Sequence, residues 1–170
     1  LRWGMLGHAK AITGEQTIMG GFTITGTNHT SFTVSDLDRA VAFYTEVLGF
    51  PLLNRSHRDP EVIARVVGVP GADIEVAYVQ APGHRLELIE YRGPADRGLI
   101  EARPCDTGFA HIAFDVDDID AVIAAVEAAG VAPVNPAQDL VHGPNKGGRA
   151  VYTRDPDGCT LEFIQRPPSA

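Results

Sequence analysis

The sequence predicts an α+β fold in which two βαβββ modules pair into a curved sheet around a shared cavity. Three observations support this prediction: an internal repeat, the same order of strand and helix patterns in each copy, and imidazole and carboxylate side chains at equivalent strand positions. The chain has 170 residues, which is enough for one domain or two small modules with a buried core.

The repeat consists of two matching pairs of segments. HTSFTVSDLD (29–38) aligns with HIAFDVDDID (111–120), and RLELIEY (85–91) resembles TLEFIQR (160–166) in the same order. Two correspondences in one order indicate a duplicated module. We therefore divide the chain into an N-terminal extension (1–23), a first module (24–92), a linker rich in Gly, Pro and charge (93–105) and a second module (106–170), with one domain spanning 24–167.

Each module shows the same order of elements. Alternating apolar and polar residues predict strands, and apolar residues at helical spacing between an Asp or Ser cap and a glycine predict one helix. In the first module we expect a strand over 27–34, a helix over 37–48 and strands near 51–57, 74–80 and 85–91. In the second we expect a strand over 109–116, a helix over 118–129 and strands near 131–134, 149–153 and 160–165.

One histidine and one glutamate of each module lie on the same predicted strand face. Side chains alternate across a strand, so His29 lies opposite the apolar face that contains Phe32. Glu87 likewise lies opposite the face formed by its two leucine neighbours. The equivalent positions of the second module hold His111 and Glu162. The apolar faces should pack against the helices, which leaves these four side chains facing the cavity.

A divalent cation would satisfy these four side chains together. A lone carboxylate in the middle of an apolar strand is costly to bury unless a partner compensates its charge. Two imidazoles and two carboxylates are ligands that borderline metals accept. The sequence therefore predicts a metal-binding cavity in which His29, Glu87, His111 and Glu162 hold one divalent ion.

Composition excludes several classes of protein. The formal net charge is −8, from 22 acidic and 14 basic residues, which argues against binding to nucleic acid. No apolar run approaches the roughly 20 residues that span a bilayer, and no signal-peptide pattern is visible at the N-terminus. Cys105 and Cys159 are too few for a disulfide framework and are expected to stay reduced. We expect a cytoplasmic protein that binds neither membrane nor nucleic acid.

Four motifs resemble the vicinal-oxygen-chelate superfamily over residues 26–166: NHTSFTVSDLDRAVAFYTEVLGF, HRLELIEY, GFAHIAFDVDDID and YTRDPDGCTLEFIQ. This superfamily covers glyoxalase I, methylmalonyl-CoA epimerase, extradiol dioxygenases and bleomycin- or fosfomycin-resistance proteins. The resemblance implies that the first and last strands of each module supply ligands to one divalent ion (Ni, Co, Zn, Mn or Fe). It also implies a homodimer, with ligands drawn from one chain or from two.

The resemblance further implies a metal-dependent lyase or isomerase of the glyoxalase I type. Such an enzyme acts on a small α-hydroxy-carbonyl or thioester substrate through a metal-stabilised enolate. We expect Glu162 to move the proton and Glu87 to serve as ligand or partner, with Tyr152 and His142 as further catalytic candidates. The candidate substrate-binding residues are Arg85, Ser31 and Asp115.

Two other functions stay open at this point. His142, Tyr152, the DPDG turn (155–158) and Glu162 resemble the signature of ring-cleaving extradiol dioxygenases, although the gap between the His and the Tyr is longer than in that pattern. Those enzymes use two His and one carboxylate, so Glu87 would crowd the iron. The third function is an antibiotic- or metabolite-binding protein of the bleomycin-resistance type, whose members generally lack the ligands. Metal content distinguishes the three: nickel, cobalt or zinc favours the first, ferrous iron the second and no metal the third.

Overall fold

Two four-stranded sheets form the framework of the protein in a computed structural model that describes residues 21–167. The first sheet has the order β1 (Thr30–Val34), β4 (His84–Gly93), β3 (Asp73–Ala81), β2 (Leu52–His57). The second has the order β5 (Ile112–Val116), β8 (Thr160–Gln165), β7 (Arg149–Arg154), β6 (Gln138–Asp139). In the first sheet β1 pairs in parallel with β4, and in the second β5 pairs in parallel with β8. All other pairs are antiparallel. The identical order confirms the α+β fold with two similar modules.

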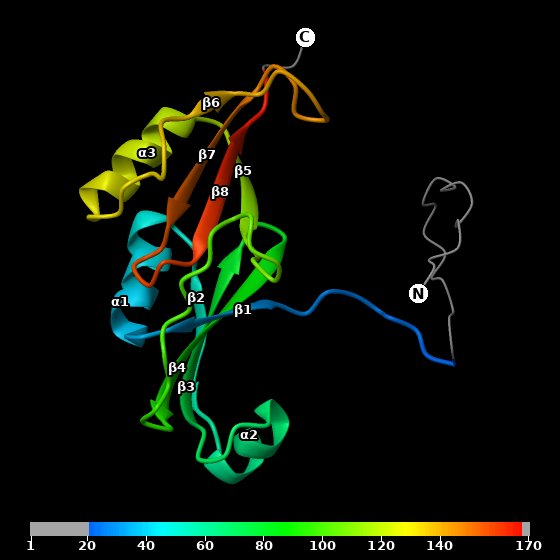
Figure 1. Cartoon of the computed structure of the whole chain (residues 1–170), viewed down its shortest axis with the longest axis vertical. Helices are drawn as coiled ribbons and strands as arrows, with labels where there is room; N and C mark the ends of the chain where they lie inside the picture. Colours follow the sequence, from blue (N-terminus) through cyan, green and yellow to red (C-terminus); the bar gives the residue numbers. More distant parts are fainter. Residues whose placement is uncertain (1–20, 168–170) are drawn as a thin grey trace.

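Both predicted helices begin after the expected aspartate caps, and α2 (Pro60–Val67) is a further helix that the sequence analysis did not predict. The other helices are α1 (Leu37–Ala42), its π-helical extension η1 (Phe43–Val47) and α3 (Ile119–Ala128). The side chain of Asp36 accepts the N–H of Arg39, and that of Asp118 accepts the N–H of Ala121. Figure 1 shows α1 and α3 on the same side of the molecule and α2 at one end. No helix in the described range is long and apolar enough to cross a membrane.

Two predicted elements differ from the structure. The helix expected over 37–48 changes to a π-helical turn at Phe43, and this wider turn places both Phe43 and Tyr44 in the core. The prediction of a strand near 131–134 is wrong. Only an isolated bridge joins Pro133 to Thr153 there, and the edge of the sheet is formed by β6. Proline cannot donate a hydrogen bond to a strand ladder, which accounts for the missing strand.

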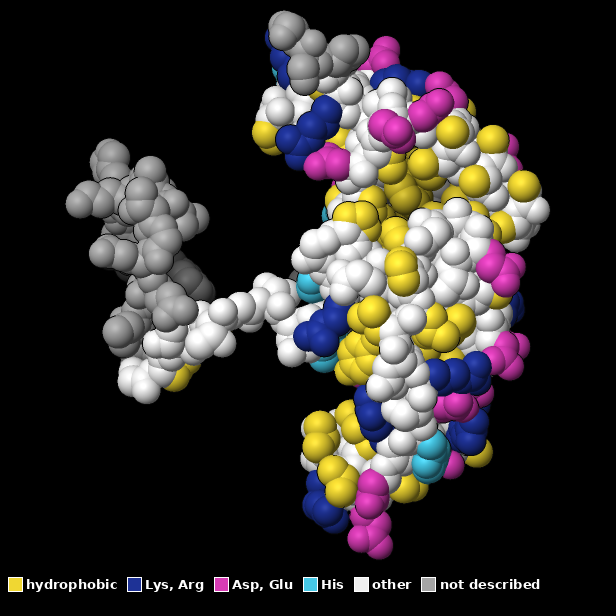
Figure 2. Space-filling model, turned by 180° about the vertical axis from the view of Figure 1, so that it is seen from behind, with side chains coloured by type: hydrophobic (Ala, Val, Ile, Leu, Met, Phe, Trp, Pro, Cys, Tyr) yellow, Lys and Arg dark blue, Asp and Glu magenta, His cyan; other side chains and the backbone are white. Residues whose placement is uncertain are grey.

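The core lies between the helices and the apolar faces of both sheets. Leu86 and Leu88 of β4 and Leu161 of β8 are fully buried, as the strand alternation predicts. One hydrophobic cluster extends across both modules, with the rings of Phe50 and Phe114 5.4 Å apart. Figure 2 shows apolar side chains gathered between the two halves of the molecule. The opposite face of each sheet is therefore free for polar side chains.

A buried hydrogen bond also links the modules. The Tyr44 hydroxyl donates to Asp155 Oδ2 over 3.1 Å, and the two residues are 0% and 3% exposed. Burial and the Asp155 carboxylate raise the pKa of Tyr44 well above its usual value, so the hydroxyl stays protonated as a donor. Asp155 Oδ1 accepts the N–H groups of Asp157 and Cys159 and thereby shapes the tight turn before β8.

Replacing Tyr44 with phenylalanine should lower the free energy of unfolding by about 1–3 kcal/mol, because a buried Asp155 oxygen loses its donor. Urea denaturation of the metal-free protein measures this change. Tyr91→Phe is the matched control, since Tyr91 is only partly buried and its hydroxyl has no hydrogen bond within residues 21–167. Equal stability of the two variants would show that the bond between the modules contributes nothing measurable.

Candidate metal centre

The first pair of predicted ligands is His29 and Glu87. His29 lies just before β1, and Glu87 lies in the middle of β4. His29 Nε2 is 3.1 Å from Glu87 Oε2, and the two side chains are 31% and 12% exposed. The parallel pairing of β1 with β4 places Ser31 directly opposite Glu87, so a residue just before β1 lies within reach of that carboxylate. The local fold thus brings an imidazole and a carboxylate from distant parts of the sequence into contact.

The second pair, His111 and Glu162, repeats this geometry. His111 Nε2 is 3.1 Å from Glu162 Oε2, and the side chains are 35% and 19% exposed. Here β5 pairs in parallel with β8, and Ala113 lies opposite Glu162. Because His111 and Glu162 are placed by the same strand register as the first pair, the repeat in the sequence corresponds to a repeat in space.

A tyrosine belongs to each pair, and only one of the two was identified from the sequence. Tyr152 of β7 lies opposite Glu162 and places its hydroxyl 3.4 Å from His111 Nε2. Tyr78 of β3, which the sequence analysis missed, lies opposite Glu87 and donates to Glu87 Oε1 over 2.5 Å. Burial, followed by the neighbouring glutamate, raises the pKa of both tyrosines, which keeps the hydroxyls protonated. A tyrosine nine or ten residues before each glutamate was the available signal.

The chain brings the four predicted ligands together as two pairs and not as one cluster. Within residues 21–167, no three His, Cys, Asp or Glu side chains lie close enough to hold one metal ion. The two pairs also belong to different sheets. The four-ligand site therefore stays a prediction, and in a single chain the structure supports it only as two half-sites.

The other predicted site residues differ in whether they contact the two His–Glu pairs. Ser31 donates a hydrogen bond to Glu87 Oε2, which ties it to the first pair. Arg85 is exposed on β4, two residues before Glu87. Asp115 forms an exposed bidentate ion pair with Arg166, and His142 lies in the exposed loop between β6 and β7. Of these residues, only Ser31 contacts a predicted ligand in the described part of the chain.

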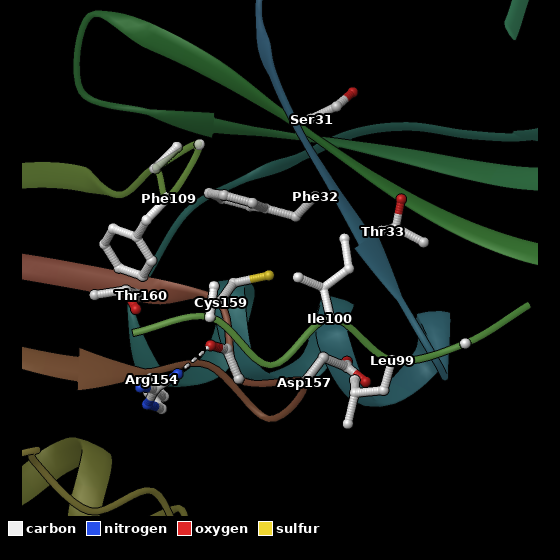
Figure 3. Close-up of a pocket in the computed structure, with 15 residues that line it drawn as sticks. Ser31, Phe32, Thr33, Leu99, Ile100, Phe109, Arg154, Asp157, Cys159 and Thr160 are labelled. Carbon is white, nitrogen blue, oxygen red and sulfur yellow. Dashed lines mark hydrogen bonds between the residues drawn. The ribbon is translucent and has the colours of Figure 1, made fainter. Parts of the chain in front are cut away.

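A pocket of about 420 Å³ lies between β1, the linker and the turn before β8, and no predicted metal ligand lines it. In Figure 3, Ile100 of the linker and Phe32 of β1 border it together with Cys159. Burial and the neighbouring carboxylates of Asp155 and Asp157 raise the pKa of the Cys159 thiol to about 12. A thiol with such a pKa is protonated at neutral pH and does not act as a nucleophile. Ser31 lines this pocket and hydrogen-bonds Glu87, so the pocket adjoins the first His–Glu pair.

The family follows from comparison with known sequences. A model of the glyoxalase/bleomycin resistance protein/dioxygenase superfamily matches residues 26–163, which include both pairs. The chain belongs to this superfamily. This glyoxalase superfamily member also resembles a solved glyoxalase family protein from Bacillus cereus, with a TM-score of 0.74 and 22% identity over 88% of this chain and 99% of the other. The family resemblance seen in the motifs and the fold class are thereby confirmed.

Two relatives of this glyoxalase superfamily member carry names of enzymes. A 2-epi-5-epi-valiolone epimerase from an Actinomyces species is 35% identical over 148 residues, covering 84% of this chain and 80% of the epimerase. A lactoylglutathione lyase from Haemophilus influenzae is 34% identical over 145 residues, covering 81% of this chain and 90% of the lyase. These relatives support an enzyme with lyase- or isomerase-type activity at the level of the family.

Proposed function

We propose that this protein is a metal-dependent lyase or isomerase that moves a proton next to a carbonyl group in a small α-hydroxy-carbonyl or thioester substrate. The observation that supports this function best is the recurrence of one His–Glu pair, with the same 3.1 Å separation, in both modules. A single such pair is readily explained as an ordinary hydrogen bond. Two pairs at equivalent positions indicate a shared chemical task.

The donor atoms of the two pairs fit a divalent cation. Each pair offers one imidazole nitrogen and one carboxylate oxygen on a partly exposed strand face, and nickel, cobalt, zinc, manganese and iron accept this mixture. His29, Glu87, His111 and Glu162 would hold the ion. When bound, it would act as a Lewis acid that stabilises negative charge on a substrate oxygen. The protein itself would orient the substrate and supply the group that moves the proton.

We further propose that the site is completed in a homodimer. Each protomer would contribute its first pair to one site and its second pair to the other, so that a two-fold dimer holds two identical four-ligand centres. The separation of the pairs onto two sheets of the chain supports this arrangement. In such a dimer neither protomer is active alone.

The names of the relatives suggest two substrate classes for a first assay. One is the hemithioacetal that methylglyoxal forms with a thiol, as expected for a lactoylglutathione lyase. The other is a polyhydroxylated cyclic ketone, as expected for an epimerase of the valiolone type. Both substrates carry an acidic C–H beside a carbonyl or masked carbonyl group. Exchange of this hydrogen for deuterium in D₂O, followed by NMR, therefore tests the shared chemistry directly.

Removal of the metal should abolish this exchange. We expect the purified protein to contain one divalent ion per chain, and a chelator should reduce C–H exchange to the background rate. Addition of the ion should restore the rate and raise the melting temperature, because a ligand that binds only the folded state stabilises it. A protein without bound metal that still catalyses exchange would contradict the proposed function.

A further inference from the structure

The two His–Glu pairs differ in how their carboxylates are held. Both oxygens of Glu87 accept hydrogen bonds from hydroxyl groups: Ser31 donates to Oε2, and Tyr78 donates to Oε1 over 2.5 Å. Glu162 has no hydroxyl donor in the described part of the chain. Its contact is His111 Nε2 at 3.1 Å. The repeat therefore conserves the proposed ligands of the two modules but not the hydroxyl groups that surround their carboxylates.

The difference arises from side chains and not from the backbone. Ser31 and Tyr78 lie directly opposite Glu87 on the two strands that flank β4. In the second sheet the same register places Ala113 and Tyr152 opposite Glu162. Alanine has no hydroxyl group, so that donor is lost.

The flanking tyrosines also point to different partners. The Tyr152 hydroxyl lies 3.4 Å from the imidazole of its pair, whereas the Tyr78 hydroxyl donates to the carboxylate of its pair. Figure 3 shows Ser31 at the edge of the neighbouring pocket, which it lines while its hydroxyl donates to Glu87. Both strands beside β4 thus contribute a donor to the same carboxylate.

Two donors on opposite oxygens hold a carboxylate in one orientation. Glu87 has several rotatable bonds, and fixing them costs conformational entropy whenever a cation binds. A carboxylate that is already fixed pays this cost during folding, so its ligand binds more tightly. Partners in the outer shell of a metal site commonly act in this way.

We infer that Ser31 and Tyr78 are positioning residues that fix Glu87 as a permanent ligand and thereby set the affinity of the protein for its divalent cation. This inference rests on the proposed function, because it requires Glu87 to bind the metal. It gives a structural reason why Glu87 should serve as the ligand expected from the sequence: hydroxyl groups hold both of its oxygens. This positioning role for Ser31 is proposed in addition to the substrate contact expected from the sequence, which stays a prediction.

Metal affinity in hydroxyl-deletion variants tests the inference. We expect Ser31→Ala and Tyr78→Phe each to raise the dissociation constant for Zn²⁺ by about 10-fold, and the double variant by up to about 100-fold. Competition with a chromophoric chelator measures the constant without any need for substrate. Ser31→Thr keeps the hydroxyl and should restore affinity close to that of the wild type.

Matched controls separate this effect from a general loss of structure. Thr33→Val and Tyr91→Phe each remove a hydroxyl group from β1 or β4 that has no hydrogen bond within residues 21–167. They should leave the Zn²⁺ constant unchanged. The urea midpoints of metal-free Ser31→Ala and Tyr78→Phe should lie close to those of the controls if the hydroxyls act mainly on metal binding. If lower urea midpoints of Ser31→Ala and Tyr78→Phe accounted for their whole loss of Zn²⁺ affinity, the positioning role would be overturned.

Glu87→Ala distinguishes failure of the inference from failure of the proposed function, because alanine has no oxygen that could replace the carboxylate as a ligand. If Glu87→Ala binds Zn²⁺ as tightly as the wild type, Glu87 is not a ligand and the proposed metal centre is wrong. If Glu87→Ala weakens binding while Ser31→Ala and Tyr78→Phe do not, the metal centre stands and only the positioning role is overturned. Weakening in all three variants supports both.

Discussion

Replacing His111 with alanine should abolish metal binding and turnover while leaving the fold intact. The variant removes one of four proposed ligands, so the dissociation constant for Zn²⁺ should rise by more than the roughly 100-fold that loss of an outer-shell partner can cost. His111 is 35% exposed and lies outside the buried core, so its truncation leaves no cavity. Elemental analysis, chelator competition and the deuterium-exchange assay measure the result, and urea denaturation checks the fold.

His57→Ala is the matched control for this variant. His57 ends β2, and its Nε2 lies 2.5 Å from Asp73 Oδ1, away from both proposed half-sites. Its replacement should leave the metal content at one ion per chain. Unchanged metal stoichiometry in His111→Ala would contradict the assignment of His111 as a ligand.

Mixing two inactive variants reveals whether the ligands come from one chain or two. His29→Ala and His111→Ala each damage every site in their own homodimers. If a site combines the first pair of one protomer with the second pair of its partner, a mixed dimer holds one intact site and one site with both changes. After refolding as a mixture, about one quarter of the wild-type activity should return, because about half of the dimers are mixed. No recovery would show that each chain supplies all ligands to its own site.

The parts of the fold that depend on local pattern were predictable from the sequence. Alternation along the strands identified the face with Leu86 and the face with Glu87, because successive side chains point to opposite sides of a sheet. Aspartate caps and glycine stops located the helices, as at Asp118 and at Gly130, which has a φ of 79°. The repeat also identified the four residues that form the two His–Glu pairs, although it predicted one cluster instead of two pairs.

The features that depend on pairing between distant segments were not predictable in the same way. The repeated spacing of a tyrosine before each glutamate marks Tyr78 only weakly, and its register opposite Glu87 is what establishes the contact. The separation of the two half-sites depends on how the modules pack through Phe50 and Phe114, which no local pattern records. At Phe43 the helix changes to a π-helical turn, although the helical spacing of apolar residues continues and gives no sign of this change.

The substitution Glu162→Gln should reduce turnover far more than it reduces metal affinity. Glu162 contacts only His111 among the polar groups of the described chain, at 3.1 Å, whereas hydroxyls hold both oxygens of Glu87. A carboxylate that moves a proton must detach from a cation or share its bond with it, and Glu162 has more freedom to do so. Loss of a general base typically costs about 10²–10⁴-fold in rate, and we expect a fall in kcat of this size.

The contrast between the two carboxylates makes this prediction specific. Glu162→Gln should retain most of the metal and lose C–H exchange, whereas Glu87→Ala should lose the metal first. Glu127→Gln, on the exposed surface of α3, controls for the change in net charge. If Glu162→Gln and Glu87→Ala lost metal and kcat in equal proportion, the carboxylates would share one role, and the proton would have to be moved by another group. Tyr152, which lies opposite Glu162 with its hydroxyl 3.4 Å from His111, would then be the next residue to replace.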